Sequence, residues 1–86
     1  MQLIKVASNS RTSLVAGAIA GVIRDNGYAE VQAIGAGALN QALKALIIAK
    51  TYLQGDGITV NFTPEFAVVM IQDKERTAIK LIVQRI

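Results

Sequence analysis

The stretch AIGAGALNQALKALIIAK, residues Ala33 to Lys50, carries a strand-like end, a glycine-containing turn and a helical pattern in direct succession. The strand-like part spans Ala29 to Ile34, and alternation along it predicts one covered and one open face. A helix is predicted from about Ala38 to Leu53, because apolar residues recur there at helical spacing. The members of that apolar stripe are Leu39, Ala42, Leu43, Leu46, Ala49 and Leu53. The stretch therefore predicts a strand, a tight turn and a helix packed on the strand.

The turn Gly35-Ala36-Gly37 has two interpretations. A helix N-terminus after glycines can receive an anion through free backbone N–H groups, which makes Gly35, Gly37 and Asn40 candidates for a phosphate-binding turn. The alternative is a tight corner, with Asn40 helping to satisfy the first helical turn. The dinucleotide fingerprint needs a small residue where Asn40 stands, and a P-loop needs a Gly-Lys-Ser/Thr ending. Neither is present, so no nucleotide cofactor is expected.

Upstream of this stretch, branched apolar residues from Leu3 to Val6 predict a short strand. A polar loop at residues 7–13 follows, and its Ser, Thr and Asn side chains are candidate helix caps. The next helix is expected from about Ser13 to Asn26 and ends before Gly27, a typical residue just past a helix end. Because a helix joins the two strands, we expect a βαβ unit with parallel strands and a right-handed crossover.

The two faces of this first helix differ in kind. The expected core face carries Val15, Ala18, Ile19, Val22 and Ile23. The opposite face carries Ala16, Gly17, Ala20, Gly21 and Arg24. Such small residues indicate that another backbone comes close, either a neighbouring helix or a ligand or nucleic-acid backbone beside Arg24.

Downstream of the second helix, alternation from Ile58 to Thr63 predicts a strand with Ile58, Val60 and Phe62 inward. Pro64 and Glu65 interrupt the pattern, which indicates an edge position or a bulge before it resumes over residues 66–71. Residues 72–76 are expected to form a charged hairpin tip, and residues 77–86 the last strand. The predicted order is βαβαββ in a single domain, residues 1–86.

Composition narrows the class of protein. The chain has 86 residues, of which 52% are hydrophobic and 17% charged, with a formal net charge of +3. No Cys or His is present, which removes thiolate chemistry, the usual general base and the usual metal ligand. We therefore expect no enzyme, no metal site and no cofactor. No segment approaches the ~20 apolar residues of a membrane span, so we expect a cytoplasmic protein with no membrane partner.

A domain this small cannot bury so much apolar surface alone, so a homodimer or higher homo-oligomer is expected. Ile48 lies among polar residues on the far face of the second helix, and this indicates a contact with another subunit. Val69 and Ile82, on the outer side of the last strands, are the other interface candidates.

Three blocks of the sequence resemble the stage V sporulation protein S family. They are AEVQAIGAGALNQALKALIIAK (Ala29–Lys50), ERTAIKLIV (Glu75–Val83) and the loop-helix start over Ser8–Arg24. The resemblance covers nearly the whole chain and implies a role in sporulation and septation control. The βαβαββ order also resembles the Alba family of chromatin and RNA-binding proteins. That similarity implies an α/β fold of the two-layer α+β type, with two helices on one face of a mixed four-stranded sheet.

The Alba resemblance further implies a dimer with projecting hairpin arms, in which a basic loop after the first strand contacts nucleic-acid backbone. The matching loop here is residues 9–12 and offers Arg11, where the Alba pattern has a pair of lysines. With Lys44, Lys74 and Arg76 it supplies the candidate phosphate contacts to DNA or RNA. Few aromatic residues are available for base stacking, so backbone contact without sequence specificity is expected. The alternative is a protein–protein interaction module in sporulation and septation control that binds no nucleic acid.

Overall fold

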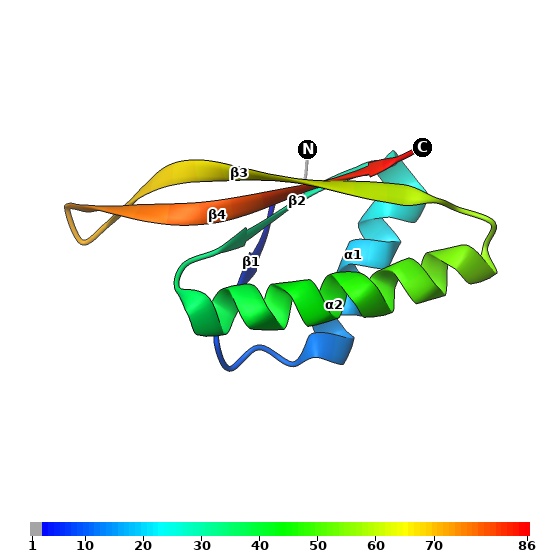
Figure 1. Ribbon diagram of the computed structural model, residues 1–86, viewed down its shortest axis with the longest axis horizontal. Coiled ribbons are helices and arrows are strands. Elements are labelled where there is room, and N and C mark those ends of the chain that lie inside the picture. Colours follow the sequence, from blue (N-terminus) through cyan, green and yellow to red (C-terminus); the bar gives the residue numbers. More distant parts are fainter. Residues whose placement is uncertain (1–2) are drawn as a thin grey trace.

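Two parallel strands and the helix between them form the first half of the fold, as the sequence predicts. The computed structural model describes residues 3–86, and Met1 and Gln2 of the predicted domain lie outside the described residues. The elements in chain order are β1 (Leu3–Val6), α1 (Thr12–Asn26), β2 (Tyr28–Ala33), α2 (Ala36–Gly55), β3 (Val60–Ile71) and β4 (Lys74–Arg85). β1 and β2 are parallel, and β4 pairs antiparallel with both β2 and β3, in the sheet order β1-β2-β4-β3. Both helices lie on one face of this mixed sheet (Figure 1).

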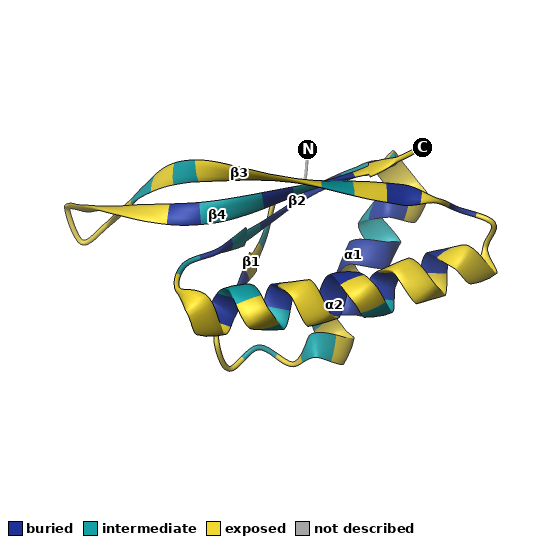
Figure 2. Cartoon of the chain, in the orientation of Figure 1, coloured by how far each residue is buried: buried dark blue, intermediate teal, exposed yellow. Residues whose placement is uncertain are grey.

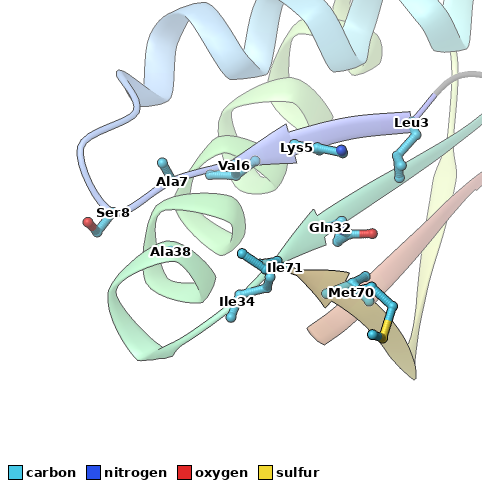
Figure 3. Close-up of a pocket in the computed structure, with 11 residues that line it drawn as sticks. Leu3, Lys5, Val6, Ala7, Ser8, Gln32, Ile34, Ala38, Met70 and Ile71 are labelled. Carbon is cyan, nitrogen blue, oxygen red and sulfur yellow. The ribbon is translucent and has the colours of Figure 1, made fainter. Parts of the chain in front are cut away.

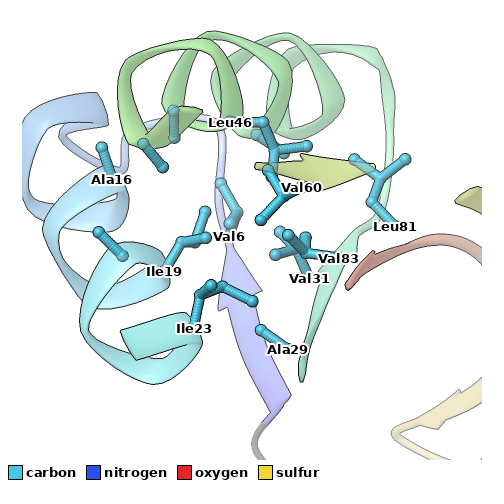
Figure 4. Packing of buried hydrophobic residues seen from close by; sticks show 14 of the residues in the cluster. Val6, Ala16, Ile19, Ile23, Ala29, Val31, Leu46, Val60, Leu81 and Val83 are labelled. Carbon is cyan, nitrogen blue, oxygen red and sulfur yellow. The ribbon is translucent and has the colours of Figure 1, made fainter. Parts of the chain in front are cut away.

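The core lies between the helices and the sheet (Figure 4). Alternation places it correctly on β2, where Ala29, Val31 and Ala33 are buried. On α1 the predicted core face is partly wrong, because Ala16 and Ala20, expected on the opposite face, are fully buried. The reason is the closeness of the two helices, which leaves room for alanine and not for larger side chains.

The second helix is also rotated relative to the stripe predicted from hydrophobicity. Its buried residues are Ala38, Ala42, Ala45, Leu46, Ala49 and Leu53. Leu43, expected in the core, is 45% exposed. Ile48, expected to contact another subunit, is half-buried and packs against the chain's own core. A hydrophobicity pattern ranks leucine and isoleucine above alanine, whereas close packing of α2 selects the small side chains.

Beyond the layered part of the molecule, β3 and β4 continue as a two-stranded arm (Figures 1 and 2). The pairing of β4 with β2 ends at Ile79, whereas its pairing with β3 runs on to Lys74. β3 is an edge strand, as Pro64 indicates, and it passes through Pro64 without a break. The turn at the tip is only Gln72 and Asp73, both with positive φ, so the strands extend further than the sequence predicts. The arm contributes to a long axis of 42 Å.

The glycine turn before α2 is a constrained corner. Gly35 has φ 88° and ψ 160°, a conformation that is essentially restricted to glycine. A Cβ on Gly37 would lie 3.1 Å from the Cβ of Ser8, so the loop after β1 packs directly on this turn. By contrast, a Cβ on Gly17 or Gly21 would meet nothing within 4 Å. The expected close approach of another backbone at Gly17 and Gly21 therefore does not occur within the chain.

Neither helix begins with the side-chain cap that the sequence predicts. Arg11 is the N-cap residue of α1 and makes no capping hydrogen bond. The Ser10 hydroxyl instead accepts a hydrogen bond from the backbone N–H of Ala7, at 2.9 Å. Gln41 ties α2 to the same loop by donating from Nε2 to the carbonyl of Ser10, at 2.8 Å. The loop is thus fixed by its own turn and by α2, and it holds Arg11 at the molecular surface.

Candidate nucleic-acid interface and assembly surfaces

The four predicted phosphate contacts lie on three separate elements. Arg11 stands at the start of α1, Lys44 on α2, and Lys74 with Arg76 on β4 at the end of the arm. All four side chains are exposed, and none makes an ion pair within residues 3–86. Lys74 and Arg76 are two residues apart on one strand and so project from the same face of the arm. The fold thus brings Lys74 and Arg76 together on the arm, whereas Arg11 and Lys44 lie on two other elements.

The predicted phosphate-binding turn keeps its helix N-terminus uncapped. α2 has no side-chain cap at Gly35. Asn40 is exposed and forms no side-chain hydrogen bond within the described chain, so its expected help to the first turn is wrong. The conformation of Gly35 and the contact of Gly37 with Ser8 explain both glycines as parts of a tight corner.

Arg24 belongs to a structural contact. Its Nε lies 2.6 Å from Oδ2 of Asp56, and the two side chains are 45% and 46% exposed. This ion pair links the end of α1 to the turn after α2. Arg24, which the sequence offered as a possible contact for a ligand or nucleic-acid backbone, therefore forms an ion pair with Asp56 instead.

Large apolar residues are exposed on α2 and on the arm, where Figure 2 colours exposed positions yellow. Ile47 on α2 is 64% exposed and lies one turn from Leu43. On β3, Phe66 is 81% exposed, Val68 68% and Met70 63%. We call these five residues the apolar saddle. Phe62 packs against the core from the same strand face, so alternation puts the β3 members on the helix side of the sheet.

Sequence reasoning did not select the apolar saddle, and its own interface candidates lie one position away. Ile48 follows Ile47 on α2, and Val69 stands between Val68 and Met70 on β3. Val69 and Ile82 are half-buried on the opposite face of the strands. The alternation of β3 contained the correct signal, because Phe62 fixes which residues share the helix side.

A network of polar side chains crosses the sheet face that the helices leave open. The Tyr28 hydroxyl donates to Oε2 of Glu30 at 2.9 Å, and Lys80 Nζ lies 3.2 Å from Oε1 of Glu30 and 3.7 Å from Oε1 of Glu65. Glu30 is only 7% exposed. The hydrogen bond from Tyr28, with that from Lys80, lowers the pKa of Glu30. The same contacts with Glu30 raise the pKa values of Tyr28 and Lys80.

This network stabilises the charged forms of Glu30 and Lys80 and links β2 to β4 and β3. Among residues 3–86, no three Asp, Glu, His or Cys side chains gather in a way that suits a metal ion. No helix of the described chain has the length and apolar character needed to cross a membrane.

Two comparisons place the chain among known proteins. A family model described as Stage V sporulation protein S matches residues 2–86. Among solved structures, the fold is similar to that of Alba from Thermoplasma volcanium, with a TM-score of 0.68 and 13% sequence identity. The similarity covers 96% of this chain and 99% of that one. At this identity it shows the fold alone, which is the two-layer, Alba-like arrangement predicted from the sequence.

Proposed function

Since the chain belongs to the stage V sporulation protein S family, we propose a finer function for this small sporulation-related regulator. It is a non-enzymatic dimer that binds nucleic-acid backbone weakly and without sequence specificity in the cytoplasm. The observation that carries the proposal is the arm, which combines exposed apolar residues along β3 with unpaired cations at its end.

The apolar saddle supports the dimer. Its five side chains are between 45% and 81% exposed, and they belong to α2 and to the helix-facing side of the arm. A hollow of about 260 Å³ beside Phe66, lined also by Pro64 and Ile79, can receive a side chain of a second copy. Burying such a surface against a second copy removes it from water, which favours association by about 25 cal/mol for each Å².

The cations support contact with phosphates. Lys74 and Arg76 occupy the tip of the arm, where no carboxylate forms an ion pair with them, and Arg11 stands on the loop after β1. A dimer presents two copies of each. Such exposed cations on loops and hairpin tips suit phosphate oxygens, which carry no sequence information.

A salt titration tests the nucleic-acid part. Fluorescence anisotropy with a labelled DNA duplex should give a slope of log affinity against log salt of roughly −3 to −4, if a dimer makes about four phosphate contacts. Arg11→Ala should reduce the steepness by about 2, because two symmetric contacts vanish. Lys74→Ala with Arg76→Ala should do the same if the arms engage. Lys50→Ala removes an exposed lysine outside the proposed contacts and is the matched control.

Sedimentation tests the dimer separately. The unaltered protein at micromolar concentration should contain no substantial monomer, and Phe66→Ser should shift the equilibrium toward monomer. Ile86→Ser is the control, because Ile86 is 75% exposed and lies outside the apolar saddle. A clean monomer of the unaltered protein would contradict the assembly.

A second function follows from the apolar saddle if nucleic acid plays no part. A chain that forms no complex with duplex DNA, single-stranded DNA or RNA at low salt is then a protein–protein interaction module in sporulation and septation control. The anisotropy and sedimentation results together separate the two functions, because only the first predicts salt-dependent binding.

A further inference from the structure

A cleft of about 670 Å³ opens between β1, the end of β2 and the arm (Figure 3). Leu3 of β1, Ile34 after β2, and Val69 and Ile71 of β3 provide apolar walls. The volume falls within the range of roughly 300–1,000 Å³ that is typical of small-molecule sites. Three parts of the chain that are distant in sequence thus build one concave surface.

The cleft lies mainly on the open face of the sheet and reaches Val6 and the start of α2 at Ala38. Ile4 packs against the core and Val6 is buried there, so Leu3 and Lys5 point away from the helices by alternation. Gln32 pairs with Lys5 in the parallel register and shares this orientation. The cleft therefore lies largely apart from the apolar saddle, and Met70 of the arm is the one residue that belongs to both.

Three polar side chains line the cleft without partners in the described chain, with Lys5 and Gln32 at one end and Ser8 at the other (Figure 3). Lys5 makes no ion pair, and Ser8 and Gln32 make no side-chain hydrogen bond within residues 3–86. They provide one ammonium, one hydroxyl and one amide beside apolar walls. A site of this composition is built to orient a small ligand through a single polar end.

The charged residues around the cleft indicate which charge the polar end of the ligand carries. Lys5 is the one ionisable residue among those lining the cleft. Ile71 and Val69 of the wall stand directly opposite Lys74 and Arg76 in the hairpin register. Cross-strand partners share a face, so these cations add positive potential at the rim. The cleft is complementary to an anion, and its single lysine matches one negative charge better than two.

We propose that this cleft binds a single-chain aliphatic carboxylate. The carboxylate lies at the Lys5 ammonium, beside the Gln32 amide, and the Ser8 hydroxyl lines the other end of the cleft (Figure 3). The aliphatic chain lies along the walls formed by Leu3, Ile34 and Ile71.

Decanoate is the probe, titrated into ¹⁵N-labelled full-length protein below its micelle-forming concentration and followed by two-dimensional NMR. We expect saturable shifts of the amides of Lys5, Ser8, Gln32 and Ile71, and small shifts at the end of α1. Decanol, which keeps the chain and lacks the charge, should bind several-fold more weakly. Lys5→Gln should weaken decanoate binding by about threefold to tenfold, as for a partly solvated charged hydrogen bond.

Matched variants separate the cleft from general effects. Lys50→Gln makes the same change at an exposed position on α2 and should leave decanoate affinity unaltered. Ile71→Ser should weaken binding, whereas Ile86→Ser should not, and both isoleucines are exposed enough to be replaced without loss of the fold. Non-saturable shifts, equal binding of decanol, or an unaltered affinity of Lys5→Gln would each overturn the proposal.

Discussion

Replacing Gly35 by alanine should destabilise the protein because of the backbone conformation alone. Gly35 has φ 88° and ψ 160°, and a Cβ there would touch nothing within 4 Å. The cost is therefore conformational and not steric crowding by neighbours. Side chains held in this region cost about 1–3 kcal/mol. For a domain of this size, each kcal/mol lowers Tm by about 4–8 °C, so a loss of roughly 4–24 °C is expected.

Gly17→Ala is the matched control for this change. Gly17 lies inside α1, and a Cβ there also meets nothing within 4 Å. Alanine is favoured over glycine in a helix interior by about 1 kcal/mol, so the same chemical change should stabilise the protein. The two variants should move the unfolding free energy in opposite directions.

Urea unfolding followed by circular dichroism measures both variants. Protein concentration must be equal throughout, because assembly makes apparent stability concentration-dependent. If Gly35→Ala is as stable as the unaltered protein, the corner before α2 is not constrained as described. A loss at Gly17 equal to that at Gly35 would show instead that any added methyl group is harmful, and the conformational reasoning would fail.

Three further predictions concern the polar network, the arm and the ion pair. The pKa of Glu30 is lowered in the folded protein, so ionised Glu30 stabilises the fold above the ordinary pKa of 4.5, and this stabilisation is lost as the pH falls below that value. The urea concentration at the unfolding midpoint should therefore fall less steeply with acidification in Glu30→Gln than in the unaltered protein. Gln72→Asn with Asp73→Gly suits the two positive φ angles of the tip, of 51° and 63°, and should stabilise the hairpin by about 0.5–1 kcal/mol, measured as slower amide exchange in the arm. Asp56→Asn removes the exposed ion pair with Arg24 and should cost less than about 1 kcal/mol in thermal unfolding, with a smaller difference at high salt.

The sequence alone was sufficient for the order of elements, the parallel pairing of the first two strands and the family. Each of these depends on local signals that act over a few residues. Alternation at Ala29, Val31 and Ala33 reports the two-residue repeat of a strand, and Gly35 marks a backbone conformation that other residues avoid. The exposure of Arg11, Lys74 and Arg76 was predictable for the same reason, since charged residues in loops and at hairpin tips remain solvated.

Only the tertiary structure decided which neighbours each face meets. Ala16 and Ala20 are buried because α1 and α2 lie close together. A helical wheel describes one helix and does not predict its distance from a second helix. Glu30 is buried because Tyr28 and Lys80 cover it from its own and the adjacent strand. The cleft beside Lys5 exists because the arm stands against β1, which is more than sixty residues away in sequence, and against the end of β2. Periodicity is a property of one segment, whereas burial, charge pairing and cavities are properties of segments brought together by folding.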